Sequence, residues 1–207
     1  MDLSVAIDAA ATAVASLAPI DNPASAPGTT LSGVMVLRTA EGPYWLSFNV
    51  GDSRVYVVGG GGIRQLTHDH SALQEARDLA ATSGAPRVIP PANVVTKALG
   101  AGQTGSVKAD YTIMPLEEGD RAVICTDGVH GVLRDSQIHA VVAAGDGPQG
   151  TADTLVRASL ESGTRDNATA VVVYAGTKSR VTLTSNVMNR MIQPVRPASI
   201  ETARRVP

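Results

Sequence analysis

Short segments of β-strand character follow one another along the first third of this chain, and turns rather than helices separate them. Gly-rich or Asp-containing turns divide the segments, as in the glycine run at residues 59–62. Such a meander argues against the strict strand and helix alternation of a doubly wound parallel sheet. The predicted strands are 30–37, 44–50, 54–58, 63–66, 94–99, 107–113, 121–126 and 168–174.

Apolar residues at helical spacing recur at four places, and two of these follow each other near the end of the domain. Residues 3–18 and 71–83 are predicted helices, and Asp135 and Thr151 are predicted to cap two more, which end near residues 144 and 162. Strands in runs and helices in pairs predict an α+β fold, in which helices pack on largely antiparallel sheets.

The composition fits one well-filled domain. Of 207 residues, 43% are hydrophobic and 17% are charged, which is a globular balance, while aromatic residues at 3% leave the core to Val, Ile, Leu and Ala. The single cysteine, Cys125, lies in a predicted strand and excludes an internal disulfide. We expect it to be a buried thiol in a reducing compartment.

Charge and hydropathy limit the possible partners. The formal net charge of −2 argues against a nucleic-acid or anionic-membrane surface, and no apolar run approaches transmembrane length. Asp2 and Asp8, with no basic segment before them, argue against a secretory leader. We therefore expect a cytoplasmic monomer without nucleic-acid or membrane partners.

The end of the chain differs in charge from the rest. From Lys178 onward it holds 6 Lys and Arg residues against one acidic residue, Glu201. We expect residues 1–176 to form the domain and residues 177–207 to form a basic, flexible tail.

Carboxylates stand at the ends of two apolar segments. Asp127 follows the strand 121–126, and Asp166 precedes the strand 168–174. A carboxylate at the end of a buried strand lies on a rigid element, where several oxygen ligands can bind one hard cation. Taken alone, however, Asp127 followed by Gly128 is more typical of a hairpin turn than of a metal site.

Other polar residues keep two interpretations open. Asp52, between two predicted strands, is either a tight turn or a metal ligand. His68 and His70 around Asp69 could form a transition-metal site, but a structural or solvent-facing role is favoured. His130, three residues beyond Asp127, has no assigned role.

Six segments stand in an order that resembles the metal-dependent serine/threonine phosphatases of the PPM type, the protein phosphatase 2C family. The resemblance covers about residues 5–175 and implies a four-layer α-β-β-α sandwich of two antiparallel sheets flanked by helices. The segments are 28–31 (GTTL), 49–54 (NVGDSR), 65–71 (QLTHDHS), 95–100 (VTKALG), 126–133 (TDGVHGVL) and 165–173 (RDNATAVVV).

The resemblance implies hydrolysis of phosphoserine and phosphothreonine in proteins by a metal-activated water, with Mn²⁺ or Mg²⁺ as cofactor and a Ser/Thr kinase as the opposing enzyme. It assigns Asp127 and Asp166 to a core metal and Asp52 to a third, weaker one. Arg54 is expected to be a structural ion-pair partner. Residues 71–93 are expected to form the flap that borders the substrate groove.

The sequence also departs from the family. A phosphate-binding Arg, an acidic segment and a first Asp-Gly motif, whose Asp bridges the two metals, precede the first matching segment in the family and are not found here. We therefore expect a domain without the family's first strands and first helix, and one weak metal site. A catalytically impaired, phosphatase-like binding or regulatory module is the alternative hypothesis.

Overall fold

A computed structural model describes residues 2–19, 21, 26–83, 89–91, 93–102 and 106–176, so the predicted tail lies outside the described residues. The helices are α1 (Leu3–Ala15), α2 (Ala72–Ser83), α3 (Asp127–His130), α4 (Asp135–Ala144) and α5 (Pro148–Glu161). The strands are β1 (Gly28–Thr29), β2 (Leu31–Thr39), β3 (Gly42–Val50), β4 (Arg54–Gly59), β5 (Gly62–Gln65), β6 (Leu99–Gly100), β7 (Asp110–Pro115), β8 (Arg121–Cys125) and β9 (Ala170–Tyr174).

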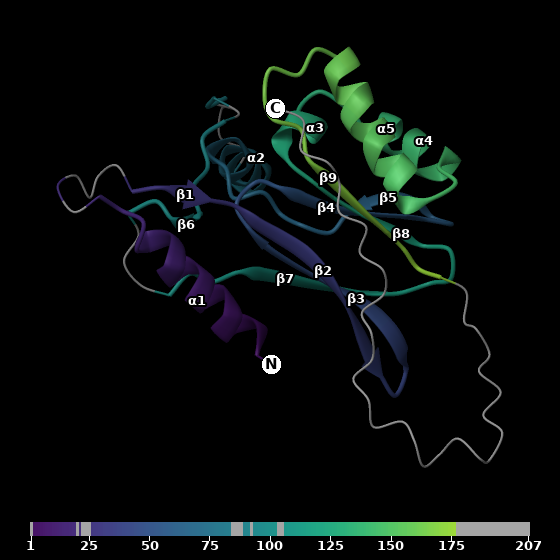
Figure 1. Ribbon diagram of the computed structural model, residues 1–207, viewed down its shortest axis with the longest axis horizontal. Coiled ribbons are helices and arrows are strands. Elements are labelled where there is room, and N and C mark those ends of the chain that lie inside the picture. Colours follow the sequence, from purple (N-terminus) through teal and green to yellow (C-terminus); the bar gives the residue numbers. More distant parts are fainter. Residues whose placement is uncertain are drawn as a thin grey trace.

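The main strands form two antiparallel sheets (Figure 1). One has the order β2-β3-β7 and the other the order β5-β4-β8-β9, while β1 and β6 make a short pair of their own. Every strand pair is antiparallel. The predicted α+β class, without parallel strand–helix units, is confirmed.

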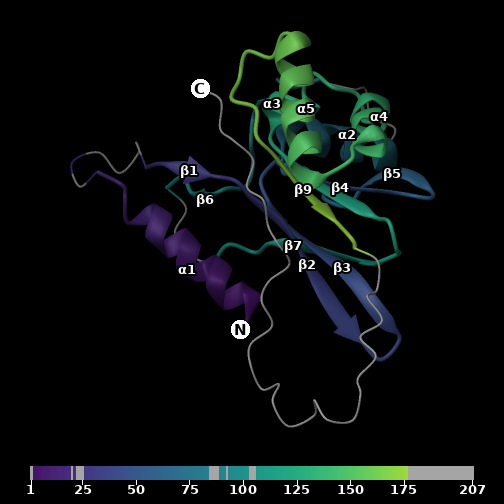
Figure 2. The ribbon, with the colours of Figure 1, turned by 45° about the vertical axis from the view of Figure 1, so that its right-hand side comes forward.

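The sheets and helices stack in four layers (Figure 2). Helices α4 and α5 pack on the outer face of the four-stranded sheet, and α1 packs at one end of the outer face of the three-stranded sheet, through Ile7 and Ala11. Between the sheets, Trp45 of β3 meets Val55 and Val57 of β4. The predicted α-β-β-α sandwich is therefore confirmed. None of the described helices is long and apolar enough to cross a membrane.

Strand β4 is buried on both faces, which explains its uninterrupted apolar sequence. Val55 and Val57 belong to the core between the sheets, whereas Tyr56 and Val58 belong to the core beneath the helices. Alternate side chains of a strand point to opposite faces, so a strand with a layer on each side needs apolar residues throughout. The turn with Asp52 is thereby held at the end of a strand that is buried on both faces.

Three local predictions were wrong. The predicted strand 94–99 is mostly irregular, because its backbone pairs with the loop before α2 through the bonds Ala72 N–H to Val94 O and Thr96 N–H to His70 O. Asp135 does not cap α4, since Arg134 holds the N-cap position and Asp135 is the first helical residue. Helix α5 starts at Pro148, where a proline's fixed φ favours a helix start, rather than at Thr151.

Candidate functional site

A pocket of about 300 Å³ opens at the start of β4 and is lined by residues of α2 and α3. Its walls are the turn before β4, the loop before α2, α2 itself and α3. The lining residues that can carry charge are Asp52, Arg54, Asp69, Arg77, Asp127 and His130.

The turn that carries Asp52 is held by several hydrogen bonds. Gly51 has φ +107°, and its carbonyl oxygen accepts from the backbone N–H of His70 at 3.0 Å and from Nδ2 of Asn49 at 2.9 Å. The Gly51 N–H donates to Nδ1 of His70 at 3.0 Å. A side chain at Gly51 would be strained at this φ and would overlap Thr30, so the turn requires glycine.

Asp127 is the first residue of the short helix α3 and not part of a hairpin turn. The carboxylate oxygen Oδ1 of Asp127 accepts from the N–H of Gly128 at 2.9 Å. Gly128 lies so close to the backbone of Asn167 that a Cβ there would overlap the Asn167 carbonyl oxygen. Glycine therefore lets the segment that carries Asp166 approach α3.

Asp52 and Asp127 face the same pocket and interact electrostatically. Burial, followed by the negative charge of Asp127, raises the pKa of Asp52 above its usual value. The Asp52 residue is only 8% exposed. Two carboxylates held together away from bulk water repel each other, and a divalent cation between them would offset this repulsion.

Asp166 lies outside the lining of the pocket, in the segment whose Asn167 backbone approaches Gly128 of α3. It is exposed, and its Oδ1 accepts from the N–H of Asn167 at 2.7 Å. The Thr126 hydroxyl donates to the Asn167 carbonyl at 3.2 Å and so ties this segment to the start of α3. Among the described residues, no three His, Cys, Asp or Glu side chains form a group that could hold a metal ion.

Arg54 has the structural role that the sequence predicted. Its Nε and Nη2 donate to the two carboxylate oxygens of Asp69 at 2.9 and 2.6 Å, and its Nη1 donates to the Tyr56 hydroxyl at 2.9 Å. These largely buried contacts engage all three nitrogens of the guanidinium. Arg54 is therefore held in place as a structural ion-pair partner.

The two histidines that flank Asp69 have separate partners. His68 Nε2 lies 2.8 Å from the Asp78 carboxylate on the surface, whereas His70 is buried beneath the Gly51 turn with its Nε2 3.1 Å from Asp110. This arrangement agrees with the structural interpretation.

His130 links α3 to the turn before β4. Its Nε2 lies 3.0 Å from the carbonyl oxygen of Asp52. Burial, followed by the positive charge of Arg54, lowers the pKa of His130, so the imidazole is neutral at pH 7.

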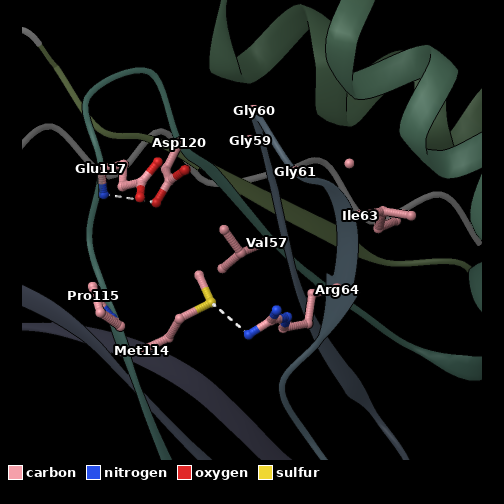
Figure 3. Close-up of a pocket in the computed structure, with 11 residues that line it drawn as sticks. Val57, Gly59, Gly60, Gly61, Ile63, Arg64, Met114, Pro115, Glu117 and Asp120 are labelled. Carbon is pink, nitrogen blue, oxygen red and sulfur yellow. Dashed lines mark hydrogen bonds between the residues drawn. The ribbon is translucent and has the colours of Figure 1, made fainter.

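A second pocket, of about 380 Å³, lies at the other end of β4, beside the β4–β5 turn (Figure 3). Figure 3 shows Asp120 and Glu117 on the wall that faces the glycines of this turn. The Asp120 Oδ2 accepts from Nε1 of Trp45 at 3.1 Å and from the N–H of Glu117 at 2.9 Å. The carboxylate thus anchors the buried indole between the sheets, and we assign it a structural role.

Known proteins are similar to this chain in sequence and in fold. No protein-family model matches it. The Listeria monocytogenes serine/threonine phosphatase Stp is 29% identical over 147 residues, and the Streptococcus pneumoniae protein phosphatase PhpP is 28% identical over 147 residues. These matches cover 70% of this chain and 56% and 57% of the two relatives.

Solved structures agree with the sequence matches. The Streptococcus agalactiae serine/threonine phosphatase superposes with a TM-score of 0.69 at 27% identity, covering 84% of this chain and 69% of that one. The catalytic domain of the serine/threonine phosphatase PstP, in complex with two manganese ions, gives a TM-score of 0.66 at 26% identity with the same two coverages. The chain is therefore similar in sequence and in fold to bacterial serine/threonine phosphatases of the PPM type. It spans less than two thirds of the length of the curated relatives it matches.

Within this chain, the structure brings two of the three predicted ligands, Asp52 and Asp127, to one pocket and leaves Asp166 outside its lining. Residues 71–93 were expected to border the substrate groove, but Arg77 and Asn93, which line the pocket, were not singled out, and His130 had no assigned role. No motif marks Arg77, since its position in the pocket depends on how α2 packs against the turn before β4. His130 lies three residues after Asp127, but this spacing places the two on one face only in a helix, and the short helix α3 was not predicted.

Proposed function

We propose that this PPM-type phosphatase hydrolyses phosphoserine and phosphothreonine in proteins and depends on Mn²⁺ or Mg²⁺. The observation that carries the proposal is the pair Asp52 and Asp127, two carboxylates that share a pocket despite their repulsion. No observation specifically favours the alternative of a catalytically impaired binding module.

The donor set fits a hard divalent cation. Carboxylate oxygens are the ligands that Mg²⁺ and Mn²⁺ prefer, and Mg²⁺ is often held by one or two carboxylates with water completing its shell. Asp52 and Asp127 would hold a cation in the pocket, and Asp127 with Asp166 would hold one at the exposed start of α3. When bound, such a cation polarises a phosphate ester and makes water more acidic.

The other pocket residues would bind and orient the substrate. Arg77 is exposed, lines the pocket and, within the part of the chain that the structure describes, makes no hydrogen bond or ion pair. Because Arg54 already pairs with Asp69 and Tyr56, whereas Arg77 has no partner among the described residues, we assign binding of a phosphate dianion to Arg77. We further propose that the protein acts as a cytoplasmic monomer and opposes a Ser/Thr kinase.

A phosphopeptide assay tests the proposal. The purified 207-residue chain is incubated with a phosphothreonine peptide and millimolar Mn²⁺, beside Asp127→Ala and Asp146→Ala. The second variant is a matched control, because Asp146 also precedes a glycine but is exposed and lies outside the pocket. We expect turnover that Asp127→Ala abolishes and Asp146→Ala preserves. A folded wild-type chain without turnover would favour the binding-module alternative.

A further inference from the structure

His130 and Asp127 lie on one face of α3. Residues three apart in a helix are neighbours on its surface, and both side chains line the pocket. His130 reaches from this face across to the turn before β4. It therefore connects the element that carries Asp127 to the element that carries Asp52.

The direction of this hydrogen bond is fixed by chemistry. A carbonyl oxygen only accepts, so the Nε2 of His130 must carry the proton and donate it to the Asp52 carbonyl at 3.0 Å. A protonated ring nitrogen cannot bind a metal ion, which excludes Nε2 as a ligand. Among the described residues no other group donates to this carbonyl.

The remaining contacts of the turn hold its other residues. His70 and Asn49 bind Gly51, and the Ser53 hydroxyl pairs with Thr30 at 2.8 Å. Asp52 stands between these anchors, and its carboxylate is repelled by Asp127. The bond from His130 is the contact that holds the Asp52 backbone against α3 in spite of this repulsion.

We propose that His130 is a positioning residue, which holds Asp52 beside Asp127 by donating its Nε2 proton to the Asp52 carbonyl, so that the two carboxylates bind one Mn²⁺ or Mg²⁺ ion. The inference rests on the metal-dependent function proposed above and assigns a residue that supports the cation site without touching the cation. Groups that orient metal ligands typically change metal affinity by about 10- to 100-fold when they are removed.

Calorimetric titration of the full chain with Mn²⁺ tests this inference. His130→Ala removes the donor, and we expect Mn²⁺ affinity to fall at least about tenfold. His130→Gln places an amide N–H near the former Nε2, and we expect it to retain affinity within about threefold of the wild type. His139→Ala, on α4 and outside the pocket, is the matched control and should leave affinity unchanged. Circular dichroism melts of all variants report whether each one folds.

A double-mutant cycle with Asp52→Asn distinguishes a positioning role of His130 from a general loss of native structure. If His130 acts through Asp52, His130→Ala should cause no further loss of Mn²⁺ affinity once the Asp52 carboxylate is gone. An equal loss in both backgrounds would overturn the inference, as would unchanged affinity in His130→Ala. A folded wild-type chain that binds no Mn²⁺ would overturn the proposed function as well, so the two failures are distinguishable.

Discussion

At the scale of single residues, the pocket contains a carboxylate that is unfavourable without a ligand. Asp52 is buried beside a second carboxylate, whereas Arg77 is exposed to solvent and has no partner among the described residues. Functional sites commonly retain a destabilising group such as Asp52, because the same group stabilises a bound ion or a transition state. Removing the charge of Asp52 should therefore improve stability and impair function.

Asp52→Asn should stabilise the metal-free protein at pH 7. The pKa of Asp52 is raised in the fold above its ordinary value of 3.8, so the charged form destabilises the native state once pH exceeds the folded pKa. The advantage of the variant should be largest at neutral pH and should shrink as the pH falls towards 4. Thermal melts in EDTA between pH 4 and 7 measure this difference. A variant that melts below the wild type at pH 7 would contradict the electrostatic explanation.

Arg77→Ala should weaken phosphopeptide binding. Loss of a hydrogen bond to a charged group costs about 1.5–3 kcal/mol, which corresponds to a KM increase of roughly 10- to 150-fold with a smaller change in kcat. Steady-state kinetics with a phosphothreonine peptide measure both constants. Arg157→Ala, an exposed position on α5, is the control and should leave both unchanged. An unchanged KM in Arg77→Ala would remove this residue from the binding site.

At the scale of elements, the sequence could predict segments whose pattern is local. The apolar runs at β4, β8 and β9 and the spacing within α1 were sufficient for these elements. Helix α3 could not be predicted in this way, because four residues are too few to show a helical period. The irregular backbone at 94–96 was missed because its hydrogen bonds go to the distant loop before α2.

Gly128→Ala should destabilise the junction between α3 and the segment before β9. A Cβ at this position would overlap the Asn167 backbone, so one of the two elements must move, at a cost of about 1–3 kcal/mol. Gly147→Ala is the matched control, since Gly147 also follows an Asp but has no atom within 4 Å of an added Cβ. We expect it to cost less than about 1 kcal/mol. Chemical denaturation compares the two, and equal costs would contradict the close approach.

At the scale of the whole molecule, the sequence was sufficient to predict the layered α+β fold. It was sufficient to predict only some residues of the candidate site. Strand runs and helix pairs indicated the layers, and the motif order indicated the PPM-type family. The sheet order β5-β4-β8-β9 and the packing of α2 beside Asp52 depend on contacts between distant segments, which periodicity does not report. For this reason Asp52 and Asp127 were predicted as candidates, whereas Arg77 was not.

Cys125 offers a probe of global stability. It is 2% exposed in the core between the four-stranded sheet and the helices, and burial raises the pKa of its thiol to about 12. The native protein should resist iodoacetamide at pH 8, because the reactive thiolate is scarce and inaccessible. Labelling should increase in parallel with unfolding in guanidinium chloride, as followed by mass spectrometry. Rapid labelling of the native protein would indicate that this core opens locally.

Phosphoester hydrolysis by this protein should require a cation bound in the pocket between Asp52 and Asp127. The most direct measurement is the rate of phosphate release from a phosphothreonine peptide as a function of Mn²⁺ concentration, for the wild type and Asp127→Ala. We predict a rate that saturates with Mn²⁺ in the wild type and is lost in the variant at every concentration. Equal rates in the two proteins, or wild-type turnover that persists in EDTA, would contradict the requirement for a cation at this site.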